Sequence, residues 1–122
     1  MSILNSAVSG RGFNTLVFCL YMLSIPVNAS SAEYKVSMQG WEFDPASLMI
    51  KTGDTVIWIN NDDTRHKLSF EDSSLGGPTR ENAHKFNIGE NFSFRFTKVG
   101  EFKYTCITHE GQDMSGIVIV KD

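Results

Sequence analysis

The sequence lacks an excess of basic residues, and this absence bears on its partners. Its 122 residues include 11 Lys and Arg against 14 Asp and Glu, which gives a formal net charge of −3. Proteins that bind nucleic acid present clustered positive charge to the phosphate backbone. The mild acidity therefore gives no reason to expect nucleic acid as a partner.

The chain also lacks an apolar run long enough to cross a bilayer as a helix. Its longest apolar stretch, residues 15–27, falls short of the ~20 residues that a membrane-spanning helix needs. Arg11 is the only charged residue before Glu33, and small residues dominate positions 28–32. A basic start, a short apolar region and small residues after it are typical of a secretory signal peptide.

We therefore expect residues 1–32 to be a cleaved signal peptide and residues 33–122 to form one exported domain. Cleavage after Ala29 or after Ala32 fits the requirement for small residues, and the position after Ala32 is preferred. The mature protein is then periplasmic or otherwise exported, without stable insertion in a membrane. A retained N-terminal membrane anchor is the alternative.

Cysteine is nearly absent from the expected mature domain. Cys19 falls in the signal peptide and Cys106 stands alone, so no internal disulfide can form. An unpaired thiol outside the cell is open to oxidation unless something occupies it. A metal ion is one occupant, and a buried structural thiol is the alternative that Cys106 alone would suggest.

Helical periodicity is missing as well, and the patterns after residue 33 are those of strands. Residues 92–96 and 102–106 alternate strictly between apolar and polar side chains, whereas 55–59 and 117–120 are continuous β-branched runs suited to strands covered on both faces. Glycine and proline turns separate these segments, and the polar stretch 71–83 fits a loop or one short helical turn. The weaker strand candidates are 34–39, 48–51, 67–70 and 85–88. Seven to eight short strands predict an all-β antiparallel sandwich.

Three soft or borderline metal ligands lie on one connection between two predicted strands: Cys106, His109 and Met114. A fourth candidate, His66, stands beside a strand earlier in the chain. Two imidazoles and one thiolate, with a weak axial thioether, define a type 1 blue-copper site. Zinc is more often given a further Cys or His than a Met. The residues therefore predict one copper ion bound by His66, Cys106, His109 and Met114, while His84 is expected to be a solvated histidine.

Three stretches carry a resemblance to a known family: Phe43-x-Pro45-x-x-Leu48-x-Ile50-x-x-Gly53-Asp54-x-Val56, then Trp58-x-Asn60-x-Asp62-x-x-x-His66, then Gly100-x-Phe102-x-Tyr104-x-Cys106-x-x-His109-x-x-x-x-Met114-x-Gly116. Together they resemble the cupredoxins, the family of plastocyanin, pseudoazurin and amicyanin, over about residues 34–121. The resemblance implies a Greek-key sandwich and the same four copper ligands. It also implies the transfer of single electrons between a donor and an acceptor protein by transient contact near His109. We expect a monomer that is not an enzyme, because four protein ligands leave no open position for a substrate.

The sequence departs from the family at two positions beside the ligands. The residue after the first histidine is commonly an Asn that ties the two ligand segments together, but here it is Lys67. Pro commonly precedes the second histidine, but here Thr108 does, and we expect its backbone N–H to point at the Cys106 sulfur. No acidic run like that of plant plastocyanins is present, so a photosynthetic partner is not implied.

Two other functions stay open on the sequence alone. The protein could buffer or deliver copper without carrying electrons, or the sandwich could be an interaction module that works without metal.

Overall fold

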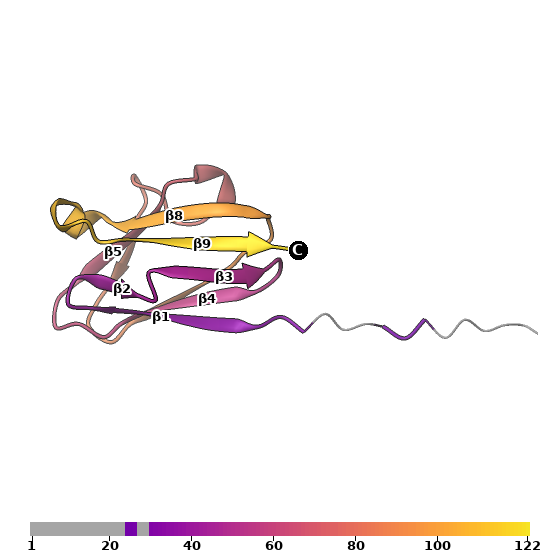
Figure 1. The fold of residues 1–122 in the computed structure, drawn as a ribbon. Coiled ribbons are helices and arrows are strands. Elements are labelled where there is room, and N and C mark those ends of the chain that lie inside the picture. The colour runs from indigo at the N-terminus through magenta and orange to yellow at the C-terminus, as the bar shows by residue number, and fades with distance from the viewer. Residues whose placement is uncertain (1–23, 27–29) are drawn as a thin grey trace, which may run out of the picture.

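The computed structural model describes residues 24–26 and 30–122, and most of the latter range is β-strand (Figure 1). The expected signal peptide lies largely outside the described residues. Within them, no helix is long and apolar enough to cross a membrane. The elements in chain order are β1 (Glu33–Gln39), β2 (Glu42–Asp44), β3 (Ser47–Lys51), β4 (Thr55–Asn60), β5 (His66–Phe70), η1 (Ser73–Leu75), β6 (His84–Phe86), β7 (Asn91–Arg95), β8 (Gly100–Cys106), η2 (Ile107–Gln112) and β9 (Ser115–Lys121).

The strands form two sheets that share one core, which confirms the expected all-β sandwich. One sheet has the order β2-β1-β4-β7 and the other has the order β3-β9-β8-β5-β6. Most neighbouring strands are antiparallel, but β1 pairs with β4 and β3 pairs with β9 in parallel. Side-chain alternation is the same for either strand direction, so the sequence pattern could not distinguish these two pairings.

Each of the eight predicted strand segments forms a strand, and β2 is an additional ninth. It is only three residues long, too short to show a period in the sequence. Its central residue, Phe43, is buried and packs edge-on against Tyr104 at 4.8 Å between ring centroids. Burial of this one side chain anchors β2 beside the long strand β1.

The strands β4 and β9 are covered on one face only, not on both as their β-branched runs suggested. In β4, Val56 and Trp58 are fully buried, whereas Ile57 and Ile59 are half-buried. Residues 117–120 of β9 alternate in the same way. In a two-layer sandwich the outer face of each sheet meets solvent, and β-branched residues there favour the strand conformation without being part of the core.

Trp58 lies at the centre of the core between the two sheets. Its ring is 5.3 Å from that of Tyr104 on β8 and 5.6 Å from that of Phe70 on β5, measured between centroids. These contacts fix β5 and β8 against the opposite sheet. The first residue of β5 and the last residue of β8 therefore occupy defined positions at one end of the sandwich. In Figure 1 that end carries the η2 connection and lies opposite the C-terminus.

Candidate metal centre

Cys106 is the last residue of β8 and points into the core, as the alternation of 102–106 predicts. Its side chain is fully buried, and it is a free thiol. The strand ladder holds it on one side, where Cys106 is paired with Leu68 of β5. On the other side its backbone N–H donates to the Met114 carbonyl at 3.0 Å. The sulfur is thus held by backbone bonds on both sides before any metal binds.

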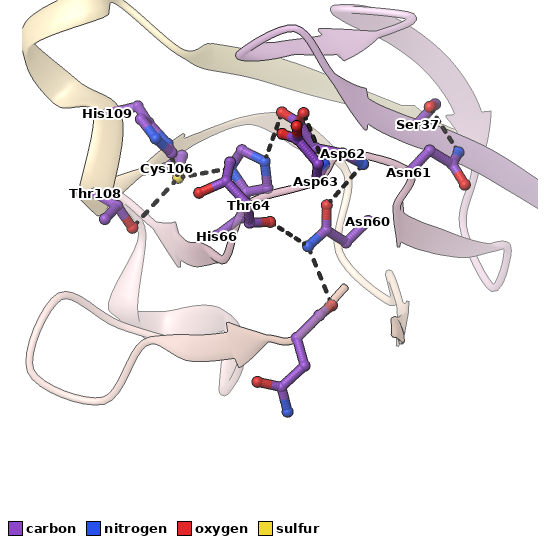
Figure 2. Close-up of polar contacts among 11 residues, drawn as sticks. Ser37, Asn60, Asn61, Asp62, Asp63, Thr64, His66, Cys106, Thr108 and His109 are labelled. Atoms are coloured by element: carbon purple, nitrogen blue, oxygen red, sulfur yellow. Dashed lines mark hydrogen bonds and ion pairs between the residues drawn. The ribbon is translucent and has the colours of Figure 1, made fainter. Parts of the chain in front are cut away.

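His66 opens β5 and is also fully buried. Its Nδ1 atom lies 3.5 Å from the Cys106 sulfur, and its Nε2 atom lies 3.1 Å from the Asp62 carboxylate (Figure 2). The two nitrogens of this ring therefore have different partners. One faces the thiol, and the other is held by an acceptor at the rear of the ring.

His109 brings a second imidazole to the same sulfur. It lies in η2 at a residue with non-helical φ and ψ of −127° and 26°, and its Nδ1 atom is 3.3 Å from the Cys106 sulfur. The ring is half-buried. Burial and then the neighbouring His66 lower the pKa of His109, while Asp62 acts in the opposite direction. A lowered pKa favours the neutral imidazole, which is the form that binds a metal.

Met114, the fourth predicted ligand, directly precedes β9 and is buried. Its carbonyl accepts hydrogen bonds from the Cys106 N–H and from the Thr105 hydroxyl, the latter at 3.2 Å. These bonds close the 107–113 connection at its base. Met114 is therefore fixed next to Cys106 through the backbone, while its thioether stays a predicted ligand.

The donor set fits a type 1 copper ion. The two imidazole nitrogens and the thiol sulfur all lie within 4.8 Å of one another. A single ion bonded to sulfur at ~2.3 Å and to nitrogen at ~2.0 Å holds each nitrogen about 3–4 Å from the sulfur. The two observed separations, 3.5 and 3.3 Å, agree with that requirement. A buried thiolate with two imidazoles suits copper or zinc and not the hard, oxygen-seeking cations.

Two residues around the centre were not assigned a role by the sequence. Asp62 holds the rear nitrogen of His66, and Trp41 stacks on His109 with ring centroids 5.6 Å apart and planes 20° from parallel. A carboxylate four residues before a predicted histidine ligand is a signal that could have identified Asp62. Trp41 lies far upstream in the turn between β1 and β2, and no spacing rule connects it to His109.

Three further residues that the sequence singled out are Lys67, Thr108 and His84, and their surroundings differ. Lys67 is exposed. Thr108 contacts the Cys106 sulfur through its hydroxyl oxygen at 3.8 Å, rather than through the backbone N–H that we expected. His84 is half-buried, not solvated, because its ring packs against Phe86 and Phe92 at 4.7 and 4.3 Å, and this burial lowers its pKa.

Comparison with known sequences places these features in a family. The family model of copper-binding proteins of the plastocyanin/azurin family matches residues 30–121. The chloroplastic plastocyanin of Tetradesmus obliquus is 29% identical over 106 residues, covering 83% of this chain and 73% of that protein. The plastocyanin of Scenedesmus fuscus is 33% identical over 86 residues, covering 65% of this chain and 86% of that protein.

Comparison with solved structures agrees. A purple cupredoxin from Nitrosopumilus maritimus is 26% identical with a TM-score of 0.60, covering 72% of this chain and 99% of that one. A reduced amicyanin variant is 28% identical with a TM-score of 0.59, covering 73% of this chain and 82% of that one. The chain therefore belongs to the plastocyanin/azurin family of copper-binding proteins, and copper is its cofactor.

Proposed function

We propose that this protein is an exported type 1 copper electron carrier whose single copper ion is held by His66, Cys106, His109 and Met114. The observation that supports this most strongly is the approach of two imidazole nitrogens to one buried thiol at the end of the sandwich. When bound, copper supplies the Cu(II)/Cu(I) couple, which takes up and releases one electron.

The protein's contribution is to hold the ligands in place and to exclude water. Cys106 and His66 lie in neighbouring strands of one sheet, so the ladder between β5 and β8 fixes their separation. Both side chains are fully buried. Cu(II) and Cu(I) prefer different ligand geometries. Ligands held in one fixed arrangement lower the reorganisation energy of electron transfer, because few bonds then change.

His109 supplies the route for electrons to the surface. Among the four proposed ligands it is the one with an accessible ring, since Cys106, His66 and Met114 are buried. A donor and an acceptor protein would each dock briefly at this end, in the small interfaces typical of redox encounters. Four protein ligands leave no open position for a substrate, so the proposal is a monomeric carrier and not an enzyme.

Copper delivery is the competing function, and the geometry favours retention of the metal over its release. A metallochaperone must expose its ligands so that an acceptor can displace them one at a time. Here three of the proposed ligands are at most 1% exposed. Release would require opening the end of the sandwich, which strand pairing and the closed 107–113 connection oppose.

The test is to load the mature protein with Cu(II) and to record its visible spectrum and its voltammogram. We expect an intense thiolate-to-copper charge-transfer band and a reversible one-electron couple, and we expect Cys106→Ser to abolish the band.

Met114→Leu should keep the copper, because an axial thioether is a weak ligand. It should raise the reduction potential, because the loss of an electron donor destabilises Cu(II) more than Cu(I). Met49→Leu, at an exposed methionine, is the matched control and should change neither property.

A colourless copper-loaded protein would contradict the assignment of the ligands. Rapid, complete transfer of copper to an acceptor without a reversible couple would favour delivery. If Met114→Leu loses copper as severely as His66→Ala, Met114 is needed to retain the metal, and its proposed role as a weak ligand that only tunes the potential is wrong.

A further inference from the structure

The Asp62 carboxylate is held rigidly behind His66. One of its oxygens, Oδ2, lies 3.1 Å from His66 Nε2, and the other, Oδ1, accepts the Asp63 backbone N–H at 3.0 Å. Its own backbone N–H donates to the Asn60 side chain at 3.1 Å (Figure 2). The Asp62 side chain is only 12% exposed, so these contacts are largely shielded from water.

The same carboxylate also reaches the turn between β1 and β2. The Trp41 backbone N–H donates to it, and the Trp41 indole stacks on the His109 ring. Trp41 has a φ of 62°, a left-handed conformation that is uncommon for a residue with a large side chain. Gly40 and Trp41 form the two-residue turn between the paired residues Gln39 and Glu42, and both have a φ of 62°. A hairpin turn of this kind requires a positive φ at both central residues, and the hydrogen bond and the stacking help to offset its cost at Trp41.

These contacts form a continuous link between the two segments that carry the ligands. Asp62 belongs to the segment that ends in His66, and His109 belongs to the connection after Cys106. Trp41 joins them, because its backbone touches the first segment and its indole touches the second. The side chain of Lys67 is exposed and provides no acceptor for such a link.

We propose that Asp62 and Trp41 are positioning residues that together hold both imidazoles in their metal-binding orientation. Asp62 accepts the Nε2–H of His66, which leaves Nδ1 unprotonated and facing the Cys106 sulfur. Trp41, anchored by Asp62, fixes the plane of His109. This inference, the Asp62–Trp41 clamp, rests on the proposed function, because it assumes that both histidines bind the copper.

The first experiment removes the acceptor behind His66. In the reduced, Cu(I)-loaded protein, NMR should show a slowly exchanging His66 Nε2–H proton that Asp62→Ala loses. Competition with a chromogenic Cu(I) chelator should show roughly a 10- to 100-fold loss of Cu(I) affinity, the usual effect of removing a partner of a ligand histidine. Asp63→Ala removes the neighbouring carboxylate, while the described contact of His66 is with Asp62, and this variant should match the wild type.

Asp62→Asn keeps the shape of the side chain and serves if Asp62→Ala does not fold. The bond to His66 then loses its charge, so the Nε2–H resonance should move upfield and the reduction potential should rise. An unchanged resonance and potential in Asp62→Asn would overturn the role of Asp62. So would a Cu(I) affinity of Asp62→Ala within twofold of that of Asp63→Ala.

The second experiment tests Trp41. The indole should shift the His109 ring protons by its ring current, and Trp41→Leu should remove that shift and lower the Cu(I) affinity. Trp41→Phe, which restores an aromatic ring, should recover a part of both effects. Identical His109 resonances in all three proteins would overturn the role of Trp41. If the wild type itself fails to bind copper, the proposed function fails; if it binds copper and the variants behave like it, only the clamp fails.

Discussion

Three polar contacts of the Cys106 sulfur are described, and the third is with the Thr108 hydroxyl. The hydroxyl oxygen is 3.8 Å from the sulfur, slightly beyond the two imidazole nitrogens. In the copper-bound protein the sulfur is a thiolate, so the hydroxyl would donate to it. Such a bond withdraws charge from the sulfur and weakens its donation to Cu(II) more than to Cu(I). At this scale, single hydrogen-bond donors adjust the potential without changing the ligands.

Replacing Thr108 by Val should therefore lower the reduction potential, because Val keeps the shape and removes the donor. Only the difference between the two oxidation states counts, and a tenfold change in a one-electron equilibrium corresponds to about 59 mV. We expect a decrease on the order of several tens of millivolts in voltammetry, with the colour unchanged. Thr105→Val is the matched control, since the Thr105 hydroxyl donates to the Met114 carbonyl and not to the sulfur. Equal shifts in both variants would contradict a specific bond from Thr108.

At the scale of elements, the connection between β4 and β5 is built on the buried side chain of Asn60. The Asn60 amide donates to the Thr64 carbonyl at 2.8 Å and to the Asn87 carbonyl at 3.1 Å, and its oxygen accepts the Asp62 N–H. The Asn60 backbone is also paired, with Glu90 and with Gly89. One side chain thus fixes the connection that carries both Asp62 and His66.

Asn60→Ala should destabilise the protein and loosen this connection. It leaves two carbonyls and one N–H without their partner. An unpaired polar group costs about 1–3 kcal/mol when it is buried, and these three are only partly buried, so each falls at the low end of that range. We expect a loss on the order of 3 kcal/mol in urea unfolding of the copper-free protein, together with weaker copper binding. Asn61→Ala is the matched control, because the exposed Asn61 side chain donates to the Ser37 hydroxyl, and the backbone bond from the Asn61 N–H to the Met38 carbonyl would remain. A loss in Asn60→Ala no larger than in Asn61→Ala would contradict this role.

The strands and the placing of Cys106 and His109 at one end of the sandwich were predictable because their signals are local. Alternation in 102–106 places Cys106 inward, and the spacing from Cys106 to Met114 lies within one connection. The remaining features depend on residues that approach only after folding. Trp41 meets His109 through a turn of the other sheet, and strand direction leaves no trace in the side-chain pattern, so the parallel pairings could not be predicted either.

At the scale of the whole molecule, the hydrogen-bonded structure begins before β1. The Ala32 N–H donates to the Asp54 carboxylate at 2.8 Å, and the Ala32 carbonyl accepts the Thr55 N–H at 2.9 Å. Cleavage after Ala32 would remove both bonds, whereas cleavage after Ala29 would keep them. We therefore propose cleavage after Ala29, in contrast to the position preferred from the sequence. Mass spectrometry of the exported protein should then find Ser30 at the N-terminus.

The same carboxylate should make the protein sensitive to acid. Hydrogen bonds from the backbone N–H groups of Ala32 and Lys51 lower the pKa of Asp54 below its ordinary value of 3.8. A lowered pKa in the folded state contributes stability that is present above the unfolded value and is lost as the pH falls through the folded value. Unfolding free energies measured in urea between pH 5 and pH 2 should decrease less steeply in Asp54→Asn. An identical slope in both proteins would contradict this contribution.

The order of the ligands along the chain has a consequence for biogenesis. Three of the four proposed ligands are Cys106, His109 and Met114, at or between the ends of β8 and β9. The strand β9 pairs with both β3 and β8, and its pairing with β8 closes the 107–113 connection. His66 opens β5, so the full set of proposed ligands comes together only when β5 has paired with β8. Copper would consequently be bound by all four residues only in the folded domain, and assembly of the metal site would follow folding rather than guide it.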